Sequence, residues 1–280
     1  MSQTINGTKL AEEIKDKVAK EIYEMKGLRP NLAIVLIGER EDSVLYVKLK
    51  EREAKKVGID THLYKCAKNI SEQELLEIID FLNKDDCVDG ILVQLPLPEG
   101  LDTDKIISAI DSKKDADCFH PKNLETLQTG KDQNRALPPV AGAVLKILAD
   151  IKYDLKGKTV CVLCNSDIFG KTLSQIFGYR GAKINIVHAQ DKNFMAETKG
   201  ADILITAIGK PRFIKKEMVK KGAVIIDVGI VKEKKKVFGD VDFEDVKNKA
   251  SYITPVPGGV GPMTIAILFE NCLKLYKKRH

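Results

Sequence analysis

Two side chains that could act together on one small molecule are Tyr46 and Lys50. They stand four residues apart in a segment, 43–57, whose apolar spacing predicts a helix, so both project from one helix face. A phenol and an amine placed together can hydrogen-bond to a ligand and exchange protons with it. The alternative is an exposed lysine beside a half-buried tyrosine, because lysine is abundant in this chain. The spacing alone leaves both interpretations open.

A third polar group ends an apolar strand. Gln94 follows the run 90–93, and the prolines at positions 96 and 98 prevent the sheet from continuing. Gln94 is therefore expected at the carboxyl end of a strand, where α/β proteins bind their ligands. The alternative is a glutamine that merely caps the strand.

Two carboxylates and an imidazole follow at Asp115, Asp117 and His120. Asp-x-Asp with one histidine is an incomplete ligand set, so no metal is expected. A carboxylate that accepts two hydrogen bonds from a ligand is the more economical role for Asp117.

The segment from Thr254 to Thr264 reads Thr-Pro-Val-Pro-Gly-Gly-Val-Gly-Pro-Met-Thr. Proline fixes φ, and glycine lacks the Cβ that keeps other groups away, so the segment predicts a stiff loop that can lie flat against something planar. An elaborate strand-to-helix turn is the alternative.

Alternating strands and helices must position these groups. Apolar runs predict strands over 32–37, 60–64, 88–93, 159–163, 183–187, 202–206 and 223–228. Helical periodicity predicts helices over 8–25, 43–57, 71–82, 170–179, 193–199 and 264–277. Such βα alternation predicts an α/β protein with mainly parallel sheets covered by helices on both faces. The strand over 159–163 feeds a polar turn and a helix, where a doubly wound sheet places its phosphate loop.

Composition narrows the class of protein. The 280 residues, 44% apolar and 31% charged, are typical of a globular chain with room for two domains. No apolar run nears the roughly 18 residues of a membrane span, and residues 1–9 lack a signal-peptide apolar region, so a cytoplasmic protein without membrane contact is expected. The net charge of +6 comes from scattered lysines without interleaved aromatics, which argues against nucleic-acid binding.

The six cysteines are expected to be reduced and mostly buried. Cys161 and Cys164 should face opposite sides of a strand, so they are not expected to form a disulfide or share a metal.

When the stretches described above are compared in their order along the chain, the chain resembles the bifunctional methylenetetrahydrofolate dehydrogenase/methenyltetrahydrofolate cyclohydrolase family. The resemblance spans essentially the whole chain, and the loop at its C-terminal end is the most specific part. The matching pieces are Tyr46-x-x-x-Lys50, 89–98, 114–121, 201–211, 227–230, 239–241 and 254–264.

The resemblance implies a three-layer α/β folate-binding catalytic domain formed by residues 1–137 plus 264–280. It also implies a Rossmann-like NAD(P)-binding domain with a doubly wound parallel sheet over 138–263, a cleft between the two, and a homodimer. It further implies oxidation of 5,10-methylenetetrahydrofolate with NADP and hydrolysis of the product to 10-formyltetrahydrofolate, in one-carbon metabolism and purine biosynthesis. By position, the resemblance implies the catalytic residues Lys50, Tyr46, Gln94 and Asp117. It implies a substrate-binding loop, next to the coenzyme, of Pro257, Gly258, Gly259 and Val260. The coenzyme-binding residues that it implies are Cys164, Asn165, Ser166, Gly170 and Ile230.

The residue types suit that chemistry. A pterin presents adjacent N–H donors that a carboxylate such as Asp117 can accept. Removal of hydride leaves a cation that the substrate delocalises itself, so the oxidation needs positioning more than an acid or base. Hydrolysis does need proton transfer, and Lys50 becomes a competent base if its pKa falls from about 10.4 to about 7, a change worth roughly 4 kcal/mol. A neutral Gln94 beside it would favour that fall, whereas a carboxylate would oppose it.

The chain departs from the family pattern mainly around the coenzyme. The family commonly has Gly-Arg-Ser where this chain has Cys164-Asn165-Ser166, and the missing arginine is suited to a 2′-phosphate. His188-Ala189, Leu137–Val140 and Cys118 also replace family residues. Asp191 is within reach of a ribose but lies past the expected strand end, so it is not assigned a role. NAD in place of NADP, a cyclohydrolase with weak dehydrogenase activity, and a non-catalytic folate- or nucleotide-binding regulator are the alternatives.

Overall fold

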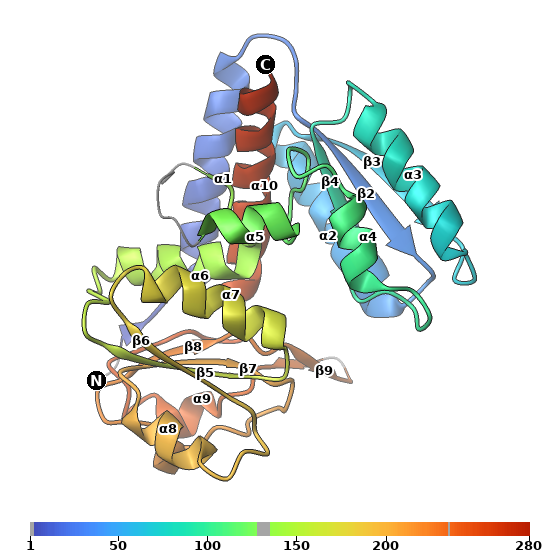
Figure 1. Cartoon of the computed structure of the whole chain (residues 1–280). Helices are drawn as coiled ribbons and strands as arrows, with labels where there is room; N and C mark the ends of the chain where they lie inside the picture. Colours follow the sequence, from blue (N-terminus) through green and yellow to red (C-terminus); the bar gives the residue numbers. More distant parts are fainter. Residues whose placement is uncertain (1–2, 128–134, 235) are drawn as a thin grey trace. The chain divides into compact units, whose positions relative to one another are not determined.

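The computed structural model describes residues 3–127, 135–234 and 236–280 (Figure 1). The chain divides into two compact units, each with its own parallel sheet. Of the described residues, the three-stranded unit comprises 12–126, 135–139 and 265–280, and the six-stranded unit comprises 3–11, 127, 140–234 and 236–264. No helix within the described ranges has the length and apolar character needed to cross a membrane.

The three-stranded unit is built around a parallel sheet of order β3-β2-β4. The central strand has a continuous apolar sequence and is buried on both faces, as a parallel strand between helical layers must be. Its strands are β2 (Asn31–Ile37), β3 (Asp60–Cys66) and β4 (Gly90–Val93). Its helices are α2 (Glu41–Val57), α3 (Glu72–Lys84), α4 (Thr103–Ala109), α5 (Pro121–Leu127) and most of α1 (Gly7–Glu24) and α10 (Val260–Arg279).

Local signals account for where these helices begin and end. Ser71 and Glu74 form a reciprocal capping box that starts α3. Gly58 ends α2 in the left-handed conformation, with φ of 84°, so the chain can turn directly into β3. One face of the sheet packs on α3 and α4 through an apolar cluster that includes Val35, Ile79 and Ile106. Short-range rules therefore fix the end of α2 and the start of α3, and packing of the apolar cluster places α3 and α4 on the sheet.

The six-stranded unit has the order β1-β11-β8-β7-β5-β6, and every neighbouring pair is parallel. Helices α6 and α7 cover one face of the sheet, and α8 and α9 cover the other (Figure 1). The strands are β1 (Gln3–Thr4), β5 (Thr159–Cys164), β6 (Lys183–Val187), β7 (Ile203–Ala207), β8 (Val224–Asp227) and β11 (Tyr252–Ile253), with a separate hairpin of β9 (Val231–Glu233) and β10 (Lys236–Phe238). The helices are α6 (Pro139–Asp150), α7 (Asp167–Gly178), α8 (Phe194–Gly200), α9 (Phe243–Val246) and a 3₁₀ turn at Lys216–Met218.

The expected α/β architecture with two parallel sheets is confirmed, and two details differ from the sequence-based expectation. The first residues do not group with the folate-binding half, because β1 pairs with β11 and extends the six-stranded sheet. Helices α4, α5 and α6 and the β9–β10 hairpin had no counterpart among the predicted elements. The cysteines behave as expected: all six are free thiols, and Cys118, Cys161, Cys164 and Cys272 are buried.

Candidate active site

Helix α2 and strand β4 bring Lys50 and Gln94 together. The Nζ of Lys50 donates a hydrogen bond of 3.0 Å to Oε1 of Gln94. Gln94 lies one residue past β4, where its backbone N–H still donates to Val35 O at 2.9 Å. Its side-chain Nε2 donates to Leu95 O at 2.8 Å, so the amide is oriented with its oxygen toward the lysine. The peptide between Leu95 and Pro96 is cis.

Tyr46 and Asp117 complete the predicted group in different ways. Tyr46 lies one turn before Lys50 on α2, half-buried, and burial raises the pKa of its phenol. Its hydroxyl makes no hydrogen bond to the other three side chains in the described part of the chain. Asp117 is close enough to Lys50 for the two charges to affect each other's pKa. The structure thus joins Lys50 and Gln94 directly, and Asp117 electrostatically.

Burial dominates the titration of this site. It lowers the pKa of Lys50, and the negative charge of Asp117 opposes that shift only in part. The same burial raises the pKa of Asp117 to about 6, although Lys50 pulls it down; nearby Asp115 pushes it up. The result is an amine that gives up its proton more easily than a free lysine and a carboxyl that is still ionised at neutral pH.

The loop that carries Asp117 is held by its neighbour Asp115. Asp115 is buried, and its Oδ2 accepts hydrogen bonds from His120 N at 2.8 Å and Asn123 Nδ2 at 3.0 Å. Its backbone forms a parallel bridge to Ile91 in β4. Asp115 therefore fixes the loop against the sheet and leaves Asp117 as the carboxylate facing the lysine. No cluster of three or more His, Cys, Asp or Glu side chains within the described ranges is arranged to hold a metal ion.

Helix α10 contributes two residues that the sequence analysis did not identify. Asn271 is buried, and its Nδ2 donates to Ala116 O at 2.9 Å and to Leu137 O at 2.8 Å. The thiol of Cys272 lies near enough to Lys50 and Asp117 for their charges to influence its pKa, which burial raises. The available signal was an asparagine within the mostly apolar segment 265–273, because a buried amide needs partners.

The Pro- and Gly-rich loop of the six-stranded unit is anchored at both ends. Thr254 Oγ1 accepts a hydrogen bond of 2.8 Å from Asp227 N, and Thr8 N donates to Gly258 O at 3.0 Å. A Cβ at Gly7 would lie 1.9 Å from Gly259 O, so the start of α1 and the loop touch through bare backbone. Gly258 has a φ of 99°, which favours glycine. These contacts hold the loop against the start of α1 and the end of β8, and Val260 begins α10 directly after it.

Two buried carboxylates organise the carboxyl ends of β7 and β8. Asp240 accepts hydrogen bonds from Thr206 Oγ1 at 2.6 Å, Ile208 N at 2.7 Å and Lys210 N at 2.9 Å. Asp227 accepts from the N–H groups of Gly229, Asp240 and Val241, and burial raises its pKa to about 7. These contacts fix the loops of Asp227-Val228-Gly229 and Gly239-Asp240-Val241 beside the sheet edge.

The predicted coenzyme-binding residues gather at the same carboxyl edge. Cys164 is the buried last residue of β5, and Ser166 Oγ accepts from Phe169 N to cap α7. A Cβ at Gly170 would lie 2.7 Å from Ile186 Cγ2, so glycine lets α7 pack closely on β6. Ile230, beyond β8, is apolar and 44% exposed. A parallel sheet, a close helix and an exposed apolar side chain at one edge fit a dinucleotide.

Comparison with known proteins identifies the same architecture elsewhere. The protein-family model for the tetrahydrofolate dehydrogenase/cyclohydrolase catalytic domain matches residues 5–117. The family model for the NAD(P)-binding domain of the same enzymes matches residues 138–280. The bifunctional protein FolD of Nitratiruptor sp. is 44% identical over 99% of both chains. The crystal structure of a bifunctional methylenetetrahydrofolate dehydrogenase/cyclohydrolase from Campylobacter jejuni is 40% identical, covers 100% of both chains and has a TM-score of 0.95. A Trypanosoma brucei homologue complexed with NADP and an inhibitor is 32% identical, with a TM-score of 0.94 over 99% of this chain and 98% of that one.

Proposed function

This chain belongs to the tetrahydrofolate dehydrogenase/cyclohydrolase family, and from that premise we propose how its own residues carry out the two reactions. It is a bifunctional enzyme of one-carbon folate metabolism. In the first reaction 5,10-methylenetetrahydrofolate loses a hydride and becomes the 5,10-methenyl cation. In the second, water adds to that cation and 10-formyltetrahydrofolate forms with release of a proton.

Lys50 is the residue that we assign to the hydrolytic reaction. The supporting observation is its hydrogen bond to a neutral amide, Gln94, in a site where burial lowers the lysine pKa. A neutral amine can take the proton of the attacking water, and its conjugate acid can return a proton as the ring opens. The incoming substrate cation adds to the tendency of Lys50 to be neutral, because like charges disfavour each other.

The other predicted residues have binding roles. The ionised Asp117 accepts the N–H donors of the pterin ring, and Tyr46 on α2 packs against or hydrogen-bonds to the same substrate. The loop Pro257–Val260 supplies a rigid backbone surface for the bound molecules. The bound coenzyme supplies the hydride acceptor, and residues of this chain orient the methylene group toward it.

The coenzyme is a nicotinamide dinucleotide bound to the six-stranded unit. The NADP complex of the Trypanosoma brucei homologue supports NADP as one coenzyme of this chain, with Cys164, Asn165, Ser166, Gly170 and Ile230 around it. NAD is the alternative, because Asn165 carries no charge to pair with a 2′-phosphate.

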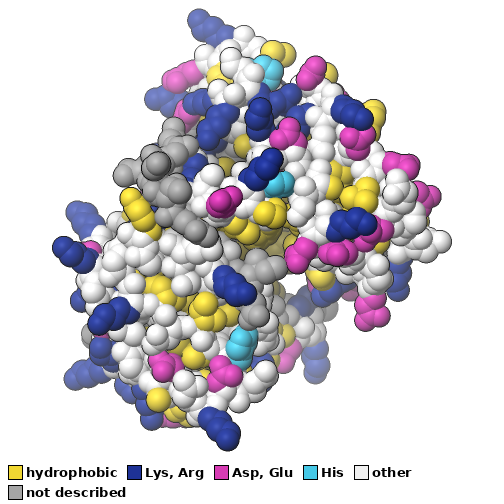
Figure 2. Space-filling model, viewed as in Figure 1, with side chains coloured by type: hydrophobic (Ala, Val, Ile, Leu, Met, Phe, Trp, Pro, Cys, Tyr) yellow, Lys and Arg dark blue, Asp and Glu magenta, His cyan; other side chains and the backbone are white. Residues whose placement is uncertain are grey.

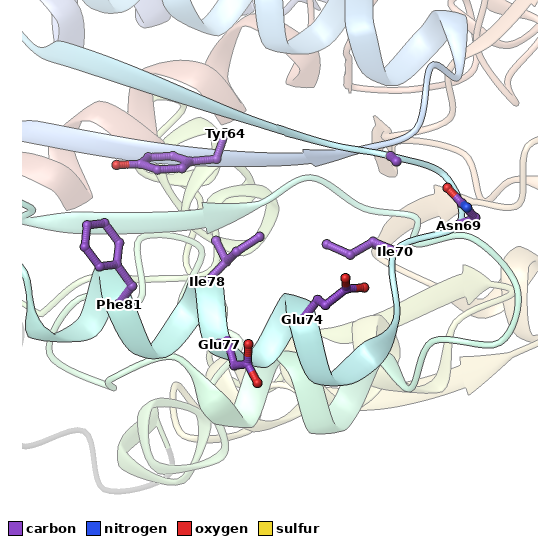
Figure 3. A pocket seen from close by; sticks show the side chains of 8 residues that line it. Tyr64, Asn69, Ile70, Glu74, Glu77, Ile78 and Phe81 are labelled. Atoms are coloured by element: carbon purple, nitrogen blue, oxygen red, sulfur yellow. The ribbon is translucent and has the colours of Figure 1, made fainter.

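A homodimer is the proposed assembly. Strand β3 lies at the edge of its sheet, so one side of its backbone is free to pair with a second copy. Beside it, β3 and α3 enclose a hollow of about 620 Å³ (Figure 3), lined in part by Tyr64, Ile70, Ile78 and Phe81. Phe81 is 58% exposed, and apolar surface of this kind is typical of an interface.

A single assay tests the bifunctional proposal. The chain is incubated with methylenetetrahydrofolate and either NADP or NAD, while coenzyme reduction and methenyl absorbance are followed, and methenyltetrahydrofolate alone is tested for hydrolysis. Both activities support the proposal. Hydrolysis without coenzyme reduction means a cyclohydrolase with a decayed dehydrogenase, and binding without turnover means a regulator.

A further inference from the structure

The topology of the six-stranded sheet fixes where the adenosine ribose of a bound dinucleotide lies. Chain order runs β5, β6, β7, but β5 stands between β6 and β7 in the sheet (Figure 1). The dinucleotide crosses such a sheet at the carboxyl ends of the strands, at the point where the order reverses, and its adenosine ribose lies beyond the end of the second strand. That strand is β6, which ends at Val187.

A carboxylate occupies the end of β6. Asp191 lies four residues past Val187 in sequence, yet the chain folds back: Asp191 N donates to His188 O at 3.0 Å, and His188 N donates to Asp191 Oδ2 at 2.7 Å. This tight turn holds the carboxylate at the strand end, closer than its sequence position indicated. Within the described ranges, no other hydrogen bond is recorded for Asp191, so its Oδ1 remains available to a ligand.

The turn after β5 brings no positive charge to this place. Asn165 is neutral, and its Nδ2 donates to Ile208 O at 2.7 Å, which ties the side chain to the β7 side of β5 rather than the β6 side. Ser166 is engaged in capping α7. A 2′-phosphate carries a charge of about −2 and needs cationic partners. The lysine nearest to Asp191 in the sequence is Lys192, which directly follows it and is exposed.

We propose that Asp191 accepts a hydrogen bond from the 2′-hydroxyl of the adenosine ribose, and that this chain binds NAD at least as tightly as NADP. The proposal rests on the dehydrogenase function stated above. A carboxylate at the end of the second strand is a good acceptor for a ribose hydroxyl and repels a phosphate in the same position. Asp191 is thereby a specificity-determining residue that binds the coenzyme and does not touch the reacting atoms.

Direct binding measurements on the full chain test the proposal. Dissociation constants for NADH and NADPH are obtained from the fluorescence of the reduced nicotinamide, which the absence of tryptophan in this chain leaves unobscured. We expect a Kd for NADH equal to or below that for NADPH. Asp191→Ala should weaken NADH binding about tenfold and leave NADPH binding unchanged or tighter. Asp191→Asn keeps an oxygen for the bond to His188 N, and it should shift the ratio in the same direction.

Lys192→Ala is the matched control, and it should change neither constant by more than about twofold. Asn165→Arg adds a cation near the β5 turn and should tighten NADPH selectively. An unaltered chain that binds NADPH more than tenfold tighter than NADH overturns the proposal, as does an Asp191→Ala variant with an unchanged ratio. Selective loss of NADPH binding in Lys192→Ala overturns it too, because Lys192 would then hold a 2′-phosphate. If neither coenzyme binds, the dehydrogenase function fails together with this inference, a result distinct from NADPH preference.

Discussion

The hydrogen bond between Lys50 and Gln94 is the residue-level feature on which the proposed hydrolytic mechanism depends. A lysine that is hydrogen-bonded to an amide oxygen keeps its position without gaining a fixed counter-charge. Asp117 supplies some negative potential, but its own raised pKa reflects how strongly burial disfavours charge in this site. The arrangement allows Lys50 to lose its proton more easily than a free lysine, while Asp117 remains ionised at neutral pH.

Replacing the amine separates the two activities. We expect Lys50→Met to lower the rate of methenyltetrahydrofolate hydrolysis by about 10³-fold, since it removes the acid–base group, and to slow hydride transfer by no more than about tenfold. Hydrolysis is followed by the loss of methenyl absorbance, and hydride transfer by coenzyme reduction. Lys48→Met, an exposed lysine on the same helix, is the control. Hydrolysis at the unaltered rate in Lys50→Met would eliminate Lys50 as the acid–base residue.

Replacing the amide by a carboxylate tests the electrostatic part of the argument. Gln94→Glu places a negative charge about where Oε1 lies, 3.0 Å from the lysine Nζ, and should raise the pKa of Lys50. Hydrolysis at pH 7 is expected to fall about tenfold or more, and its pH–rate profile should move to higher pH. Gln94→Met removes the hydrogen bond without adding charge and should not move the profile upward. Identical profiles for the two variants would refute this account.

The pKa of about 6 for Asp117 predicts a pH dependence of substrate binding. Below pH 6 the carboxyl is protonated and loses acceptor capacity, so KM for the folate should rise as pH falls from 7 to 5. Asp117→Asn should have a high KM that barely changes over this range.

The same pKa predicts an effect on stability. Because the folded-state pKa of Asp117 lies above the ordinary value of 3.8, ionised Asp117 destabilises the fold at pH 7, and Asp117→Asn should raise the Tm there. A lower Tm at pH 7 would contradict this interpretation.

At the scale of elements, helix α2 is held in place by a buried ion pair with α1. Lys15 Nζ lies 2.7 Å from Glu53 Oε2, and both side chains are about nine-tenths buried. Arg52 and Lys56 also contact the Glu53 carboxylate. Since Glu53 follows Lys50 by less than one turn, this pair fixes the segment of α2 that presents the amine to which we assign the hydrolytic reaction.

Removal of the Glu53 charge should destabilise the fold in a pH-dependent way. The lysine partners lower the pKa of Glu53 to about 2 from its ordinary 4.5. Its stabilising effect is therefore present above about pH 4.5 and is lost as the pH falls toward 2. Glu53→Gln should lower the free energy of unfolding by about 2 kcal/mol at pH 7, with a smaller difference at pH 3. Denaturant unfolding at both pH values measures this, with exposed Glu24→Gln as the control; a loss independent of pH would point to packing instead.

At the scale of the whole molecule, the proposed assembly does not rely on a charged patch. Figure 2 shows basic side chains interspersed with acidic ones over the visible face rather than gathered in one patch. The assembly that we propose depends instead on the edge of β3 and the apolar residues beside it. We expect the chain to be a dimer by sedimentation or light scattering, and Phe81→Glu to shift it to a folded monomer, because Phe81 is 58% exposed. Tyr23→Glu, at 86% exposure on α1, is the control. A dimer unaffected by Phe81→Glu would place the interface elsewhere.

The sequence predicted features that depend on short-range rules. Apolar runs located most of the strands, and the family resemblance placed Lys50 and Gln94 in one site, where a hydrogen bond joins them. Contacts made across long stretches of chain were not predictable in the same way. Asn271 and Cys272 stand in an apolar helix whose pattern does not indicate which loop it meets. Asp191 appeared to be too far along the chain, because a backbone turn that returns to His188 leaves no periodic signal.

The pairing of β1 with β11 has a consequence for how the protein is made. Thr8 and Gly258, which lie beside this pairing, are 250 residues apart in the chain. The ribosome releases β1 long before β11 exists, so this edge of the six-stranded sheet cannot close during most of synthesis. The three strands of the other sheet lie within residues 31–93, so that sheet can form earlier, and α10 joins its unit only at the end of synthesis. The loop over 254–264, which the same closure fixes in place, is therefore among the last parts of the molecule to acquire its working shape.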